Sequence, residues 1–194
     1  MSTLTATSVA RKAGLALVVA ALAVLGVTAM SPATGNEQVS AYDVVGELSR
    51  DSTPSDVLDS RFDPGLIVEG SSRLLFRDSR SSHWVSVAST GDVCLSSLYD
   101  EGSSQWTAGT TCIAPNYLQE GGLRLSQGLG TPTSGSDVTL IADGIANEQV
   151  RRDVEEAGGA IPVDNLVVFP VGHRPGVLTV EGLDGGSLEL GSGK

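Results

Sequence analysis

The sequence has few of the residues on which catalytic and metal sites usually depend. Of its 194 residues, two are cysteine and two are histidine, His83 and His173. It contains no Gly-x-Ser-x-Gly nucleophile motif, no His-Glu-x-x-His zinc motif and no Asp-x-Asp-x-Asp-Gly calcium loop. We therefore expect a non-enzymatic protein with no catalytic residues, no metal site and no cofactor.

Lysine and aromatic residues are also scarce. Lysine occurs only at Lys12 and Lys194, and the chain has 12 basic and 23 acidic residues. Because Arg11 and Lys12 precede every acidic residue, the part of the chain after Lys12 has ten basic against 23 acidic residues, a net charge of −13. So acidic a surface repels nucleic acid and anionic lipid, and we expect neither as a partner. With only 4% aromatic residues, the core must consist mainly of Val, Leu and Ile.

One long apolar run is present, at residues 13–30 (AGLALVVAALAVLGVTAM). As a helix it would span about 27 Å, slightly less than the roughly 30 Å hydrocarbon core of a bilayer. It is longer than the usual apolar region of a signal peptide, which is about 7–15 residues. Small residues ending at Ala29 offer a signal-peptidase site. Two alternatives remain open: a single-pass anchor, or a signal peptide cleaved near Ala29.

The charges around this run predict its orientation. Arg11 and Lys12 are the only charged residues before Glu37. Since basic residues stay on the cytoplasmic side, residues 1–12 form a cytoplasmic leader and the chain after residue 30 is exported. Residues 31–40 (SPATGNEQVS) are small and polar, as in a linker, and residues 41–194 form the extracytoplasmic domain. Membrane contact is then limited to the N-terminal helix.

The two cysteines, Cys94 and Cys112, are 18 positions apart. In an oxidising compartment they favour one intramolecular disulfide. The alternatives are a metal site and a nucleophilic thiol, but two cysteines with only His83 and His173 as further ligands make a poor zinc site.

Short apolar and β-branched runs predict a mostly antiparallel β domain. We expect strands at residues 72–76, 84–88, 93–98, 123–125, 138–141, 166–169, 177–180 and 188–190, and a hairpin turn at residues 90–92. Because residues 84–88 and 93–95 alternate imperfectly, at least one strand should be buried on both faces. We expect loops at residues 99–110 and 126–137, a weak helix at 41–48, and a short helix that begins after Thr53.

A late helix is predicted at residues 146–157. Asn147 is a suitable N-cap, Val150, Val154 and Ala157 form one apolar stripe, and two glycines follow. The fold class is therefore mainly β with minor α (α+β), stapled by a disulfide and preceded by an apolar helix.

Several short motifs occur in an order that resembles a group of uncharacterised actinobacterial exported or membrane-anchored proteins with a small two-cysteine domain. They are Ser72-Arg73, Trp84-Val85-x-Val87, Val93-Cys94-Leu95, Gly109-x-x-Cys112, Asp143-Gly144-Ile145 and Asp164-Asn165-Leu166-Val167. The resemblance covers about residues 45–170. It implies no catalytic residues and no cofactor.

We therefore interpret the chain as a binding or structural domain at the cell envelope, with an envelope protein or ligand as its partner. Two other hypotheses remain. An envelope hydrolase would need a cleft joining His83 or His173 to a carboxylate, with Asp143 as an isolated candidate acid or base. A secreted inhibitor would present residues 99–111 as a rigid, exposed loop.

The apolar run predicts export. Residues 1–40 fused to a phosphatase that is active only outside the cytoplasm should give an active enzyme. A matched fusion in which Val18 and Val19 are replaced by aspartate should be inactive, because two charges interrupt the run. Phosphatase activity in whole cells measures both, and an inactive wild-type fusion would contradict the localisation.

Overall fold

The computed structural model describes residues 39–102, 104–129, 135–170, 178–183 and 185–190. They belong to one compact unit that begins at Glu37. The apolar run at residues 13–30 lies outside the described residues. Within the described residues, no helix is long and apolar enough to cross a membrane.

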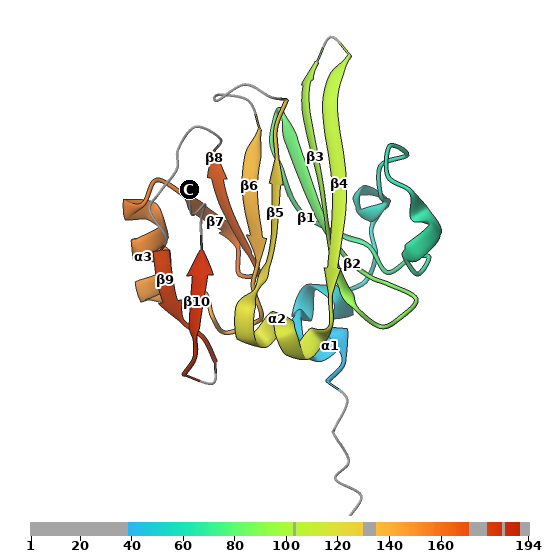
Figure 1. Ribbon diagram of the computed structural model, residues 1–194. Coiled ribbons are helices and arrows are strands. Elements are labelled where there is room, and N and C mark those ends of the chain that lie inside the picture. Colours follow the sequence, from blue (N-terminus) through green and yellow to red (C-terminus); the bar gives the residue numbers. More distant parts are fainter. Residues whose placement is uncertain (1–38, 103, 130–134, 171–177, 184, 191–194) are drawn as a thin grey trace, which may run out of the picture. The chain divides into compact units, whose positions relative to one another are not determined.

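Two four-stranded antiparallel sheets dominate the unit (Figure 1). The first has the order β1-β2-β3-β4 and the second the order β5-β6-β8-β7, while β9 and β10 form a separate hairpin. The strands are β1 (Arg73–Arg77), β2 (Ser81–Val87), β3 (Val93–Gly102), β4 (Gln105–Ile113), β5 (Leu123–Gln127), β6 (Ser136–Leu140), β7 (Ala160–Val163), β8 (Leu166–Pro170), β9 (Leu178–Glu181) and β10 (Ser187–Leu190). The expected fold class, mainly antiparallel β with few helices, is confirmed.

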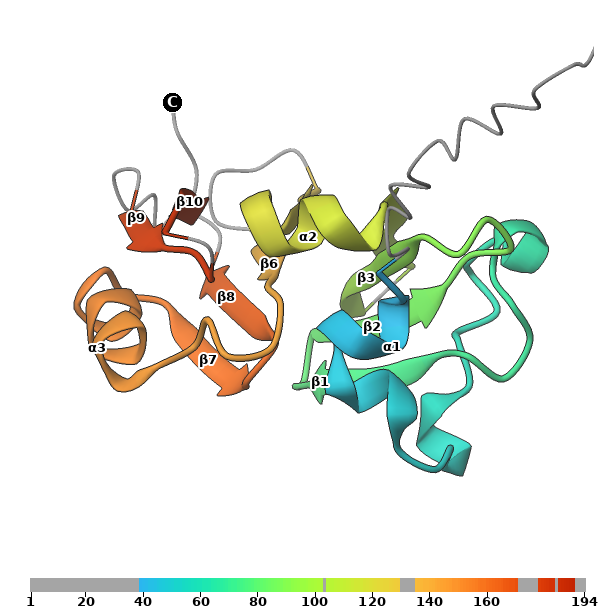
Figure 2. The ribbon, with the colours of Figure 1, turned by 90° about the horizontal axis from the view of Figure 1, so that it is seen from below.

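The helices are short. They are α1 (Ala41–Val44), α2 (Pro115–Gly121) and α3 (Glu148–Glu156), with single 3-10 turns η1 (Gly46–Ser49), η2 (Pro54–Asp56) and η3 (Pro64–Leu66). α3 confirms the late helix: the Asn147 side chain accepts from the N–H groups of Gln149 and Val150, and Val150 and Val154 are buried. α1 and α2 lie together at one end of the sheets (Figures 1 and 2).

The expectation of a loop at residues 99–110 is wrong, and residues 99–111, the segment of the inhibitor hypothesis, are mostly strand. β3 extends to Gly102 and β4 begins at Gln105, so the two strands form one long hairpin (Figure 1). The polar residues of this stretch look like a loop in the sequence. They form strands because Tyr99 pairs with Thr107 and Asp100 with Trp106, and β-branched and aromatic residues favour extended backbone.

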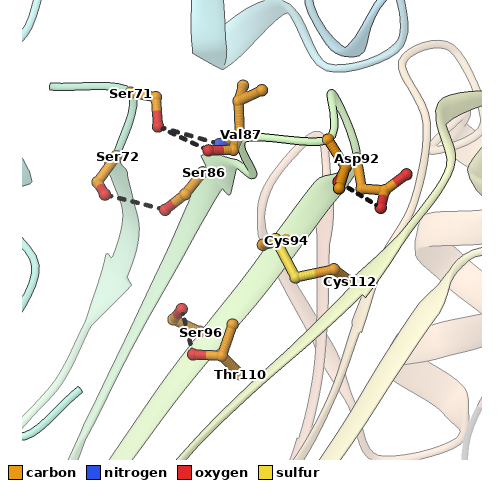
Figure 3. The surroundings of a disulfide bond; sticks show 10 residues. Ser71, Ser72, Ser86, Val87, Asp92, Cys94, Ser96, Thr110 and Cys112 are labelled. Atoms are coloured by element: carbon orange, nitrogen blue, oxygen red, sulfur yellow. Dashed lines mark hydrogen bonds between the residues drawn. A yellow bond between two sulfur atoms is a disulfide. The ribbon is translucent and has the colours of Figure 1, made fainter. Parts of the chain in front are cut away.

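Cys94 and Cys112 form the expected disulfide and face each other directly across β3 and β4, with a Cα–Cα distance of 4.0 Å. Figure 3 shows the hydroxyl pairs around it: Ser96 with Thr110 (2.8 Å), and Ser86 with Ser72 (2.9 Å). These side chains point to the outer face of the first sheet, away from the second sheet. The hydroxyl groups on this face therefore hydrogen-bond to one another.

The segment before β1 covers that outer face. Phe62 packs edge-on against Trp84 with ring centroids 5.6 Å apart, and Leu98 completes a small apolar cluster. The covering segment buries the outer face of β2, and the main core buries its inner face. Every residue of β2 is therefore buried. The expectation of a strand buried on both faces is thus confirmed, and its cause is the covering segment.

A buried carboxylate attaches this segment to the edge of the sheet. Asp56 is 2% exposed and accepts two hydrogen bonds from the Arg50 guanidinium (2.7 and 2.6 Å) and one from the backbone N–H of Leu74 (2.7 Å). The Arg50 hydrogen bonds hold the pKa of Asp56 well below its usual range, although burial opposes them. Because β1 is an edge strand, the contact with Leu74 also protects an N–H group that another chain could otherwise pair with.

The side chain of Gln127 links the two sheets at the place where β4 lies beside β5. The oxygen of its side-chain amide accepts from the Gly109 N–H (2.8 Å), and its nitrogen donates to the Thr107 carbonyl (3.1 Å). A side chain at position 109 would collide with this amide, which explains the glycine. The inner faces of both sheets then enclose one core, built mainly from Val, Leu and Ile as expected.

Reduction of the disulfide should destabilise the protein. Opening a closed loop of this length costs about 3 kcal/mol of unfolding free energy on the loop-closure model. For a domain of this size we expect the melting temperature to fall by roughly 6–12 °C. Circular dichroism melts with and without reductant measure the shift. Thiol titration of the denatured, unreduced protein is the control, and two titratable thiols would contradict an intramolecular bond.

Candidate functional site

The β1–β2 turn, at residues 78–81, separates two hollows. An inner cavity of about 490 Å³ lies between the sheets, and an outer groove of about 610 Å³ lies on the other side of the turn. Asp78, Ser79, Arg80 and Ser81 line both. They lie near the ends of the sheets opposite α1 and α2 (Figure 1).

The turn is held rigidly by its own aspartate. The Asp78 carboxylate accepts from the backbone N–H groups of Arg80 (2.7 Å) and Ser81 (2.6 Å). Burial alone would raise the pKa of Asp78, but these hydrogen bonds outweigh burial and the pKa is lowered. The Asp100 N–H donates to the Arg80 carbonyl (2.7 Å), which ties the turn to β3. The backbone around Arg80 is therefore fixed.

The inner cavity exists because the facing strands have small side chains at this end. In the second sheet, Ser136 and Ala160 lie on the inner face, whereas two to four residues further along β6 the same face has Val138 and Leu140. Across the space, Ser81 is the corresponding small residue of β2. The core is filled at the end near α1 and α2 and left hollow at this end.

Much of the wall of the cavity is apolar. Phe76 and Tyr99 line it from the first sheet, and Pro162, Val168 and Pro170 line it from the second. The backbone at residues 158–159 forms another part of the wall. No larger residue fits at Gly159, because a Cβ atom there would lie 2.5 Å from the Phe169 ring and 2.9 Å from the Val154 side chain.

A polar atom without a partner lies in this wall. Ser136 is 4% exposed and lines the cavity, and its hydroxyl has no hydrogen-bond partner among the described residues. An unsatisfied buried hydroxyl costs about 1–3 kcal/mol. The Ser136 oxygen itself has almost no accessible surface, so a molecule in the cavity does not reach it.

His83, one of the two histidines singled out in the sequence, lies on the inner face of β2 and is fully buried. Its Nδ1 is 2.9 Å from the Ser97 hydroxyl, its ring stacks on Phe76 with centroids 6.2 Å apart, and its Nε2 has no partner among the described residues. Burial lowers the pKa of His83 to about 4, although the charge of Asp78 opposes this.

This histidine does not have the geometry of a hydrolase site. Ser97 and His83 are each 0% exposed, so neither contacts a substrate in this conformation. In addition, Asp78 makes its hydrogen bonds to the turn and not to the imidazole. His173 lies outside the described residues. The hydrolase hypothesis therefore receives no support from His83.

Asp143, the candidate acid or base of the Asp-Gly-Ile motif, acts as a structural residue. Its carboxylate accepts from the Gly46 N–H (2.7 Å) and from the Asn165 side chain (2.5 Å). Its own N–H donates to the Val44 carbonyl (2.9 Å). Asp143 and Gly144 form a turn, with Gly144 at a positive φ of 83°.

The outer groove is polar and its charges are largely paired. Arg61 donates to Asp59 (2.9 and 3.0 Å) and to Asp100 (2.6 Å), and its guanidinium lies over the exposed Trp106 ring. The hydrogen bonds from Arg61 lower the pKa of Asp59 to about 2. Among the described residues, no group of three or more His, Cys, Asp or Glu side chains is placed to hold a metal ion.

Comparison of the chain with protein-family models, curated proteins and solved structures found no match. The class that the geometry defines is therefore one of architecture: a disulfide-linked antiparallel β domain with a cavity at one end of its core.

The stability of the fold should fall as the pH is lowered from 7 to 5. Over this range unfolded chains bind a proton at a histidine with a pKa of about 6.5, but folded His83, with its pKa near 4, stays neutral. Lowering the pH from 7 to 5 should therefore reduce the free energy of unfolding by about 2 kcal/mol. Urea denaturation at pH 7 and pH 5 measures the change.

The matched variant is His83→Gln, which has no group that titrates in this range. It should be less stable than the wild type at pH 7 and should lose most of the difference between pH 7 and pH 5. An equal pH dependence in the variant would assign the titration to another group.

Proposed function

We propose that this protein is a non-catalytic ligand-binding domain that works outside the cytoplasm, at the cell envelope. The observation that supports this most directly is the inner cavity between the two sheets. A volume of about 490 Å³ is within the usual range of sites for small organic ligands. Apolar walls with a few polar groups are also typical of such sites.

The disulfide supports the compartment in this proposal. Structural disulfides form and persist in oxidising environments, and Cys94 and Cys112 are bonded. The apolar run at residues 13–30 supplies the export signal in this proposal, either as a retained anchor with its N-terminus inside or as a signal peptide cleaved near Ala29. The resemblance to exported two-cysteine proteins agrees with this location.

A cavity that binds ligands should be blocked by filling it. Ala160→Trp places a large side chain at a position that lines the cavity. The matched control is Thr179→Trp on the exposed side of β9, outside the lining. We expect N-phenyl-1-naphthylamine, an uncharged aromatic fluorophore, to bind the wild type and the control but not Ala160→Trp.

The measurement is fluorescence titration of the full chain purified after export, under the same conditions for all three proteins. Circular dichroism confirms that each is folded. Equal fluorophore binding by folded Ala160→Trp and by the wild type would show that the cavity is not the binding site.

A further inference from the structure

Arg80 differs from the other arginines of the described residues. Five of them form ion pairs with carboxylates: Arg50, Arg61, Arg124, Arg151 and Arg152. Arg73 is buried and donates hydrogen bonds to backbone carbonyl groups. The Arg77 guanidinium lies over the Trp84 ring, on the outer side of the sheet. The Arg80 side chain is exposed and makes no hydrogen bond or ion pair within the described part of the chain.

The position of Arg80 in the fold indicates a role for its unpaired charge. Arg80 lines the inner cavity, and its backbone is fixed by the hydrogen bonds to Asp78 and Asp100. Asp78 is the acidic residue of the cavity lining, and its carboxylate is already engaged by two backbone N–H groups. On a chain with so large an excess of acidic residues, Arg80 is therefore an exposed, unpaired arginine in the lining of the inner cavity, and the same residue also borders the outer groove.

The cavity thus offers two kinds of contact. Phe76 and Tyr99 on one side, and the prolines Pro162 and Pro170 on the other, offer flat apolar surfaces. Arg80 offers a planar set of donors that matches a carboxylate or a phosphate.

We propose that the inner cavity binds a small organic acid with a ring: the ring lies between the aromatic and proline walls, and the anionic group pairs with Arg80. This proposal rests on the ligand-binding function proposed above and specifies the chemistry of the ligand. Carboxylate and phosphate share the recognition by Arg80, so the test includes both.

Four probes with one common phenol ring separate these contributions. They are 4-hydroxybenzoate, 4-hydroxyphenyl phosphate, the neutral 4-hydroxybenzyl alcohol and the cationic tyramine. Calorimetric titration of the full chain should show that at least one of the two anions binds more tightly than the alcohol, and that tyramine binds most weakly. The tighter anion identifies the head group.

Arg80→Gln should weaken binding of the preferred anion by about tenfold or more, because a hydrogen-bonded charge pair is lost. It should leave 4-hydroxybenzyl alcohol unchanged. The control Arg152→Gln removes the same charge from an exposed position on α3 and should leave every affinity unchanged. An equal loss in both variants would assign the effect to net charge and overturn the role of Arg80.

Ser136→Ala is a control in the lining of the cavity. Removing a buried hydroxyl that has no partner should raise the melting temperature of the free protein. The same change should leave the affinity for 4-hydroxybenzoate unchanged, because a molecule in the cavity does not reach this hydroxyl. A large loss of affinity in this folded variant would contradict recognition of the anion by Arg80.

The failure of this inference is distinguishable from the failure of the proposed function. If the anions and the alcohol bind equally well, and Ala160→Trp abolishes all of this binding, the cavity is a ligand site but not one for acids. If none of the four probes binds while N-phenyl-1-naphthylamine does, the inference is also overturned and the proposed function stands. If no probe binds, and N-phenyl-1-naphthylamine binds Ala160→Trp as tightly as it binds the wild type, both the inference and the proposed function are wrong.

Discussion

The register of β3 against β4 is the constraint on which most of the structure depends, and the disulfide holds it covalently. Because neighbouring residues of a strand point to opposite faces, a slip of one position would exchange the two faces of β3. Leu95, Ser97 and Tyr99 would leave the core and the cavity wall, and Cys94 and Ser96 would replace them. The bond between Cys94 and Cys112 permits only the register in which Tyr99 lines the cavity.

The two ends of the core serve different purposes. Near α1 and α2, branched aliphatic side chains such as Leu140 and Leu166 fill the space between the sheets, and this end provides most of the hydrophobic stabilisation. At the other end, Ser81, Ser136 and Ala160 are too small to meet across the same space. Side-chain packing is lost at this end, and a buried hydroxyl has no hydrogen-bond partner in the described part of the chain. Both lower the free energy of unfolding. A binding site would explain why such an end is retained.

Several elements were predictable from local patterns. Alternating or continuous apolar runs indicated β1, β3, β6 and β8, and the Asn147 cap with the Val150 and Val154 stripe indicated α3. β4 and β7 were not predicted. β4 has an irregular polar pattern because its inner side meets Gln127 and its outer side meets Cys94 and Ser96, so its apolar content is low. β7 is an edge strand that contains Pro162, a residue that normally argues against a strand.

The sequence by itself determined the class of domain, the disulfide pair and the absence of familiar catalytic motifs, because these depend on composition, spacing and compartment. It also identified His83 and Asp143 as unusual residues, but it could not assign their roles. Only the tertiary structure placed His83 in the core, used Asp143 to attach the segment at Gly46, and brought Arg80 and Ser136 to one cavity. Arg80 and Ser136 lie 56 positions apart on different sheets, and no local pattern encodes contacts between distant strands.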